Sequence, residues 1–169
     1  MTHTQLQPLA SETLRTTSIP VDLTPSTPRP LYLVVTGPLS PGDQLDISAD
    51  ARVTNDCGRP SGTRYTVGVG WHLWCYQYVG PGINTGTWSR ISHSQGANVT
   101  PDGHHLDLHI SRLHTVPGDW PAGGRMVVVL QADAHSTAWQ KNGGDDCLTV
   151  DTGYGQLIVR PWVAAPATA

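Results

Sequence analysis

The chain has 169 residues and a formal net charge of −3, which is enough for one domain with a sizeable core and gives no positive field to attract nucleic acid. Only 14% of the residues are charged, and the single Lys (Lys141) and single Glu (Glu12) leave few solvent-facing helix formers, which excludes an all-α fold and disfavours an α/β fold. No apolar stretch approaches the ~20 residues that span a bilayer, and the N-terminus shows no secretory signal, so we expect a soluble protein with no membrane partner.

The first 30 residues are expected to form an extended arm. They contain many prolines, serines and threonines and show no sustained hydrophobic period, and proline favours polyproline II structure or isolated pairing at a sheet edge. The alternative is a solvated tail, but such tails seldom carry as many Leu and Ile residues as this segment. We therefore expect the arm to order against a partner, with Leu9, Leu14 and Ile19 as candidate partner-binding residues. At the other end, 164–169 is expected to be a short disordered tail.

The sequence over 31–163 predicts one domain built from strands. Turn-forming Gly, Pro, Asn and Asp residues recur at short intervals. Apolar and polar residues alternate strictly over 45–54, which is typical of a strand buried on one face, and a longer strand is predicted over 65–78. Six further strands are predicted over 31–36, 87–92, 104–113, 125–133, 147–151 and 156–163.

This arrangement of elements predicts the fold class. Eight strands joined by short turns, with no helical pattern long enough to cross between them, indicate an antiparallel β-sandwich or jelly roll. The sequence has no internal repeat at a fixed period, which argues against a propeller or a solenoid.

The long strand predicted over 65–78 carries aromatic side chains on one face. Trp74, Tyr76 and Tyr78 recur at every second residue, which spaces them by roughly 6.8 Å along the strand. The opposite face is also apolar, and a strand that is apolar on both faces of a small antiparallel sandwich needs cover from outside its own pair of sheets. We take these three residues, with Trp88, as candidate partner-binding residues. The alternative is that the aromatic row belongs to the sandwich core.

Catalytic and metal chemistry are not predicted, and no cofactor is expected. The one Glu lies in the arm, most Asp residues lie in turns where bonds to backbone amides account for them, and no nucleophile elbow or phosphate loop is present. His105, Asp107 and His109 share one face of a strand, but the outer two stand roughly 13 Å apart and cannot bind one ion. His105 and Asp107 could contribute two ligands only where a neighbouring strand supplies the rest. A glycosidase built from two Asp residues is an alternative that no spacing favours.

Three cysteines, Cys57, Cys75 and Cys147, are too few for a disulfide scaffold and follow no metal-binding spacing. Cys57 and Cys147 both lie among turn residues and could meet in a disulfide at one end of the molecule. Cys75 lies inside an apolar pattern, where a core position is expected.

Part of the chain resembles a known group of proteins. The segments 101–106, 120–123, 127–129 and 148–159 resemble segments of small β-rich virion proteins in tailed phages of actinobacteria, and the resemblance covers 98–162. The resemblance implies a capsid decoration or minor virion protein that forms a homo-oligomer on the major capsid lattice. It carries no catalytic residues over to this chain.

We therefore expect a virion structural protein on the capsid exterior, with the major capsid protein and further copies of itself as partners, a trimer being favoured. Its function would be mechanical, because surface buried across capsomer boundaries stabilises a shell. The arm would add buried contact area at positions that a compact domain cannot reach. The competing hypothesis is a carbohydrate-binding or adhesion module in which Trp74, Tyr76, Tyr78 and Trp88 stack on host-surface glycans.

Overall fold

The computed structural model describes residues 6–8, 21–22, 29–55, 66–78, 89–100, 105–135, 148–151 and 155–164. These residues form antiparallel β-strands and contain no helix, which confirms the all-β fold class. No membrane-spanning helix is therefore present in the described ranges. The strands are β1 (Leu6–Pro8), β2 (Val21–Asp22), β3 (Arg29–Leu39), β4 (Gln44–Asn55), β5 (Val67–Gln77), β6 (Ser89–Val99), β7 (His105–Thr115), β8 (Gly124–His135), β9 (Leu148–Val150) and β10 (Gln156–Ala164).

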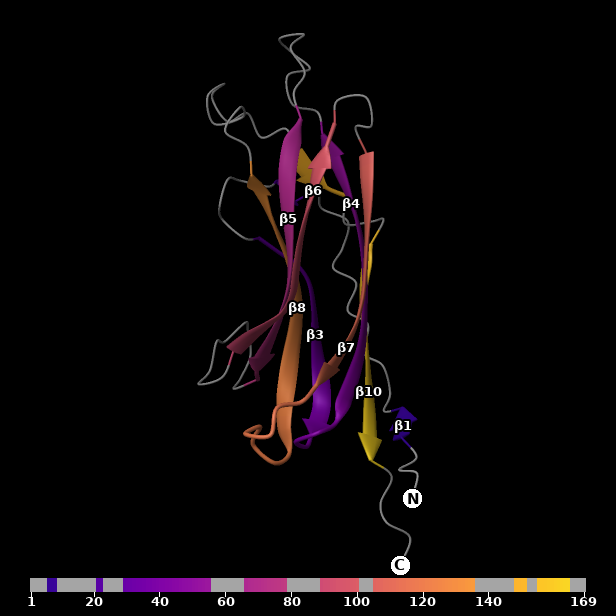
Figure 1. Cartoon of the computed structure of the whole chain (residues 1–169), viewed down its shortest axis with the longest axis vertical. Coiled ribbons are helices and arrows are strands. Elements are labelled where there is room, and N and C mark those ends of the chain that lie inside the picture. The colour runs from indigo at the N-terminus through magenta and orange to yellow at the C-terminus, as the bar shows by residue number, and fades with distance from the viewer. Residues whose placement is uncertain are drawn as a thin grey trace, which may run out of the picture.

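The strands form two sheets that run side by side along the long axis of the molecule (Figure 1). The β4 sheet has the order β1, β10, β4, β7, and β9 and β2 extend it beside the end of β4. The β8 sheet has the order β3, β8, β5, β6. The longest strands have 12 residues, which corresponds to about 40 Å of extended chain.

The strand pairs are nested in a way that defines a jelly roll. β1 pairs with β10, β3 with β8, β4 with β7 and β5 with β6. The pairing is that of one long hairpin whose turn lies between β5 and β6. This hairpin folds over, so that successive strand pairs belong alternately to the two sheets. The predicted β-sandwich or jelly roll is confirmed, and each of the eight predicted strands corresponds to one of β3 to β10.

The hydrophobic core lies between the inner faces of the two sheets. Leu45, Ile47 and Val53 of β4 point inward with no exposed surface, and the polar residues between them point outward. This alternation follows the strict period of two in the sequence. Trp71 and Leu73 of β5 fill the facing side of the core and are also fully buried.

β9 and β10 lie end to end along the same edge of β4, with extra residues between them. Val150 and Leu157 are seven residues apart in the sequence. Their partners on β4, Val53 and Ala49, are only four residues apart. At the end of this insertion, a Cβ added to Gly155 would overlap the carbonyl oxygen of Asp50 and the hydroxyl of Tyr32. Glycine is therefore required at 155 because the backbone passes so close to both sheets.

Two short strands from the first 30 residues extend the β4 sheet of their own chain. β1 pairs with the end of β10, at the lower end of Figure 1, and β2 pairs with β9. This isolated edge pairing is one of the two conformations that the prolines of the expected arm favour. Leu9, Leu14 and Ile19 lie outside the described residues, as does the tail from 165 onward.

Candidate binding surface

The outer face of the β8 sheet carries a second hydrophobic cluster, separate from the core between the sheets. Its centre is Val127 and Val129 of β8, which face away from the core and yet have no exposed surface. Cross-strand neighbours on β3 and β5 cover them. We call this set the outer apolar cluster; its members are Leu33, Val35, Trp74, Tyr76, Tyr78, Val127 and Val129.

The strand register explains how these residues meet. Val129 lies opposite Leu33 on one side and Trp74 on the other, and Val127 is flanked in the same way by Val35 and Tyr76. Each row therefore places an aliphatic side chain of β8 between β3 and an aromatic residue of β5, the kind of cross-strand contact that stabilises a sheet. Residues 126–130 of β8 are all fully buried, so this strand is apolar on both faces.

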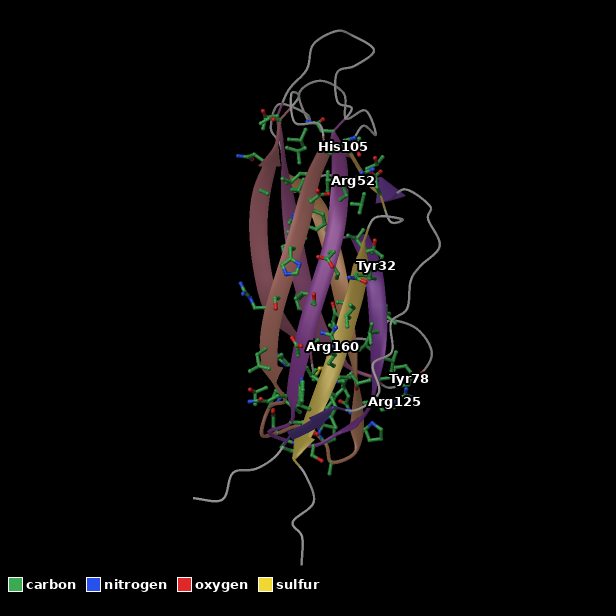
Figure 2. All side chains as sticks on the ribbon, turned by 90° about the vertical axis from the view of Figure 1, so that its right-hand side faces the viewer. Tyr32, Arg52, Tyr78, His105, Arg125 and Arg160 are labelled. Atoms are coloured by element: carbon green, nitrogen blue, oxygen red, sulfur yellow. The ribbon has the colours of Figure 1, made fainter. Side chains whose placement is uncertain are left out.

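The aromatic row of β5 lies on this outer face and not in the core between the sheets. The ring centroids of Trp74 and Tyr76 are 5.7 Å apart and their planes are inclined by only 10°. Further along, the Arg125 guanidinium lies over the Tyr78 ring at 5.2 Å from its centroid, and Figure 2 shows the two side chains near one end of the molecule. The Arg125 Nε also donates to the carbonyl oxygen of Thr36, at 2.8 Å, which fixes the guanidinium over the ring.

The environment of Tyr76 differs from that of an exposed phenol. Burial raises the pKa of its hydroxyl, and a hydrogen bond with the Gln131 side chain offsets part of that increase, while the neighbouring Cys75 adds to it. Tyr76 is thus neutral at physiological pH and presents a hydroxyl at the boundary between the outer apolar cluster and more polar residues of β8.

Beyond the cluster, the same outer face becomes polar and then hollow. His72 Nε2 lies 3.5 Å from Asp133 Oδ1, a carboxylate oxygen on the neighbouring strand. Next to this pair, glycines on β5 and β6 leave an open hollow of about 280 Å³. Its lining residues are Gly68, Val69, Gly96, Ala97 and Asn98.

The outer face of the β4 sheet is polar in contrast. Arg52 Nε donates to Asp151 Oδ2 at 2.9 Å, and Thr54 donates to the same oxygen at 2.8 Å. Arg160 Nη1 lies 3.4 Å from Asp46 Oδ2, and Figure 2 shows Arg52 and Arg160 spaced along this face. Such a face is adequately solvated without a partner, because its charged groups are paired and reach water.

The three-residue pattern of His105, Asp107 and His109 lies on this polar face. His109 Nδ1 contacts Asp50 Oδ1 at 2.6 Å, and His105 Nδ1 contacts the Thr54 hydroxyl at 2.9 Å. Partial burial on its own would raise the pKa of Asp50, but hydrogen bonds from His109 and Gln156 and the charge of His109 together lower it. Within the described part of the chain, no three His, Cys, Asp or Glu residues are grouped so that they could hold a metal ion.

The predicted partner-binding residues divide into two groups. Trp74, Tyr76 and Tyr78 lie together in the outer apolar cluster, whereas Trp88 lies outside the described residues. Of the three cysteines, Cys75 is a buried core residue, and Cys57 and Cys147 are outside the described ranges.

Sequence reasoning missed the aliphatic half of the cluster and its Arg125 rim. The uninterrupted apolar run over 126–130 was a signal for Val127 and Val129, because a strand that is apolar at every position must be covered on both faces. Leu33 and Val35 had no comparable signal, since their outward orientation depends on the register of β3 against β8.

Comparison of the sequence with protein-family models and with curated proteins finds no match.

Proposed function

We propose that the chain is a virion structural protein that decorates a capsid exterior and attaches through the outer apolar cluster. The observation that carries this proposal is the outer face of the β8 sheet, which is apolar over the outer apolar cluster although only the inner face packs against the other sheet. An apolar sheet face rimmed by polar residues is typical of a surface that binds another protein. The resemblance of 98–162 to phage virion proteins points to the major capsid protein as that partner.

The composition of the cluster suits a protein interface. It combines Trp, Tyr and Arg, which are the residue types that most often dominate binding energy when they are centrally placed and desolvated. Trp74 and Tyr78 are half-buried in the isolated chain, so a partner that lies over them would remove further apolar surface from water. The polar β4 sheet would then face solvent.

Four of the described carboxylates have structural contacts, which supports a structural role for them. Asp43 accepts a hydrogen bond from the Ser40 backbone amide at 2.7 Å and so closes the turn between β3 and β4. Asp46, Asp50 and Asp151 each contact a basic side chain of a neighbouring strand. These contacts hold turns and neighbouring strands together and account for these four carboxylates.

Co-sedimentation with empty shells of the phage's major capsid protein tests the proposal. Leu33→Lys places a charge at the half-buried rim of the outer apolar cluster and should abolish sedimentation with shells. Ile158→Lys is the matched control, because Ile158 is a half-buried aliphatic residue on the outer face of the β4 sheet and its variant should sediment like the wild type. Shell binding that survives both Leu33→Lys and Trp74→Ala would refute attachment through this face.

A second candidate function is carbohydrate binding, favoured by the near-parallel rings of Trp74 and Tyr76 and by the nearby hollow. Aromatic faces stack on sugar rings, and Gln131, His72 and Asn98 supply polar groups along the same face. A glycan array with the purified chain separates the candidates. Saturable binding that is lost in Trp74→Ala would favour carbohydrate recognition, whereas the absence of any glycan ligand would leave capsid attachment as the proposed function.

A further inference from the structure

β7 forms a long and regular edge of the β4 sheet. All 11 of its residues pair with β4 without a register shift, and no other strand in the described residues pairs with its far side. Its side chains alternate, with Leu108 and Ile110 buried against the core and Asp107 and His109 exposed on the outer face. A long unpaired edge of this kind is a template for strand addition unless it is protected.

The other edges carry the usual protections. β3 contains Pro30 and Pro38, and its pairing with β8 shifts register beside each of them. The pairing of β6 with β5 shifts register between Leu73 and Trp74. On the far edge of the β4 sheet, β1 pairs only with 162–164 of β10 and β2 only with 149–150 of β9, and β10 itself contains Pro161. Proline, bulges and very short edge strands all discourage pairing between chains.

The backbone of β7 has its hydrogen-bonding groups directed for such pairing. Just beyond the strand, the Val116 amide donates to the Asp43 carbonyl oxygen at 2.8 Å. In an antiparallel pair, the backbone amide and carbonyl groups of every second residue bond the same neighbouring strand. Because the β4–β7 register is uninterrupted, the odd-numbered residues of β7, Asp107 and His109 among them, direct their amide and carbonyl groups to the open edge. Of these groups, the Ser111 carbonyl oxygen accepts a hydrogen bond from Arg112 Nη1 at 3.1 Å and would exchange it on pairing.

We propose that β7 pairs with β7 of a second copy of this chain, antiparallel and centred on Leu108. In this register Leu108 lies opposite the partner's Leu108, and Leu106 lies opposite the partner's Ile110. Apolar residues on the core side thus meet apolar residues. On the outer face, Asp107 lies opposite the partner's His109, and symmetry repeats that pair.

The exposed side chains of the outer face favour this pairing by charge. The His109 side chain is 65% exposed, and its Nδ1 contact with Asp50 leaves Nε2 on the opposite side of the ring. Across the edge, Nε2 would meet the partner's Asp107 carboxylate. The His109 side chain would then lie between two carboxylates, a favourable arrangement for a histidine, and this arrangement occurs twice in the dimer.

Arg112 fixes the centre of the pairing. It is exposed although it lies on the same side of β7 as Ile110, and a charge at that position discourages strand addition at this end of the strand. Centring on Ile110 would bring Arg112 against the partner's Leu108. Centring on Leu108 keeps Arg112 outside the seven paired residues, 105–111.

The described edges also fix the number of copies. β7 has the longest edge among them that is free of proline and register shifts, and an interface of β7 with β7 of a second copy closes as a twofold dimer. This differs from the trimer expected from the sequence. The dimer does not depend on capsid attachment, because the outer apolar cluster lies on the other sheet.

Sedimentation equilibrium of the full chain tests the interface. The wild type should dimerise, and Asp107→Lys, which replaces the two carboxylates that face His109 across the edge with ammonium groups, should raise the dimer dissociation constant by roughly tenfold or more. Thr115→Lys is the matched control, because Thr115 is exposed on the same face of β7 but outside the paired segment, and its variant should dimerise like the wild type. A wild type that stays monomeric, or an Asp107→Lys dimer as tight as the wild type, would overturn the proposal.

Disulfide trapping tests the register in a background with Cys57 and Cys147 replaced by Ser. Leu108→Cys should cross-link two copies on mild oxidation, because 108 is the position that lies opposite itself. Ile110→Cys should not, since its neighbour across the edge is the partner's Leu106. The reverse pattern, or no cross-link in a Leu108→Cys protein that remains folded by circular dichroism, would contradict the proposed register.

Discussion

Trp74 lies directly opposite Val129 on the outer face of the β8 sheet, and Val129 has no exposed surface although it faces away from the core between the sheets. An aromatic residue of the predicted binding row thus packs against a fully buried residue of the outer face. The outer apolar cluster therefore contributes to the stability of the sheet and is also the proposed binding surface for a partner. Stability measurements test the first role, and binding measurements test the second.

The first prediction compares two tryptophans of β5 that point to opposite faces. Trp71→Ala should lower the free energy of unfolding by about 3–5 kcal/mol, because it leaves a cavity in the core between the sheets. Trp74→Ala should cost only about 1–2 kcal/mol, because its side chain is half-buried. Urea denaturation with unchanged slopes measures both values. Equal costs would mean that Trp74 is as much a core residue as Trp71.

The second prediction concerns the close approach at Gly155. Gly155→Ala should destabilise the domain by about 1–3 kcal/mol, because the added Cβ overlaps the Asp50 carbonyl oxygen and the Tyr32 hydroxyl. Gly37→Ala is the control, since a Cβ at Gly37 meets no atom within 4 Å. Thermal unfolding of the two variants checks the difference, and an unaffected Gly155→Ala variant would show that the backbone can move away at this point.

The third prediction concerns acid stability. The pKa of Asp50 is lower in the folded chain than its ordinary value of 3.8. A lowered folded-state pKa contributes stability that is present above the unfolded-state value and is lost as the pH falls through the folded-state value. Unfolding titrations below about pH 4 should therefore show a shallower acid limb for Asp50→Asn than for the wild type. Ser48→Ala, on the same face, should retain the wild-type limb, and an unchanged Asp50→Asn limb would exclude this carboxylate as a source of acid sensitivity.

The fourth prediction concerns the N-terminal segment. Deletion of residues 1–30 removes β1, β2 and the first two residues of β3, which lie at edges of the two sheets, and should leave the jelly roll folded. It should also abolish shell attachment, because we expect the segment to add binding area. Circular dichroism reports the fold and co-sedimentation reports attachment. Unchanged attachment by a folded deletion variant would remove the segment from the proposed interface.

Much of the fold was predictable because a β-strand with one buried face has apolar and polar residues that alternate along the sequence. The alternation over 45–54 gave β4 and its orientation, and turn residues such as those at 40–43 marked where the chain changes sheets. β6 was predicted to end at Ser92 but continues to Val99. Its second half contains Ser, His, Gln and Gly, which have weak strand preferences, so pairing with β5 and not local preference determines its length.

The candidate site was only half predictable for a similar reason. The aromatic row could be predicted, because its residues recur at every second position within one strand and this period is visible in the sequence. The contribution of Leu33 and the cation over Tyr78 depend on register between strands far apart in the chain. The pairing of Arg52 with Asp151, 99 residues away, is likewise a product of the topology and has no local signal.

Hydrogen exchange of the chain, free and bound to empty shells, tests the central claim most directly. If the outer apolar cluster is the attachment surface, amides of β3, β5 and β8 should gain protection in the bound state, while those of β4 and β10 should exchange as in the free chain. Protection confined to the β4 sheet, with β5 and β8 unchanged on binding, would contradict the account.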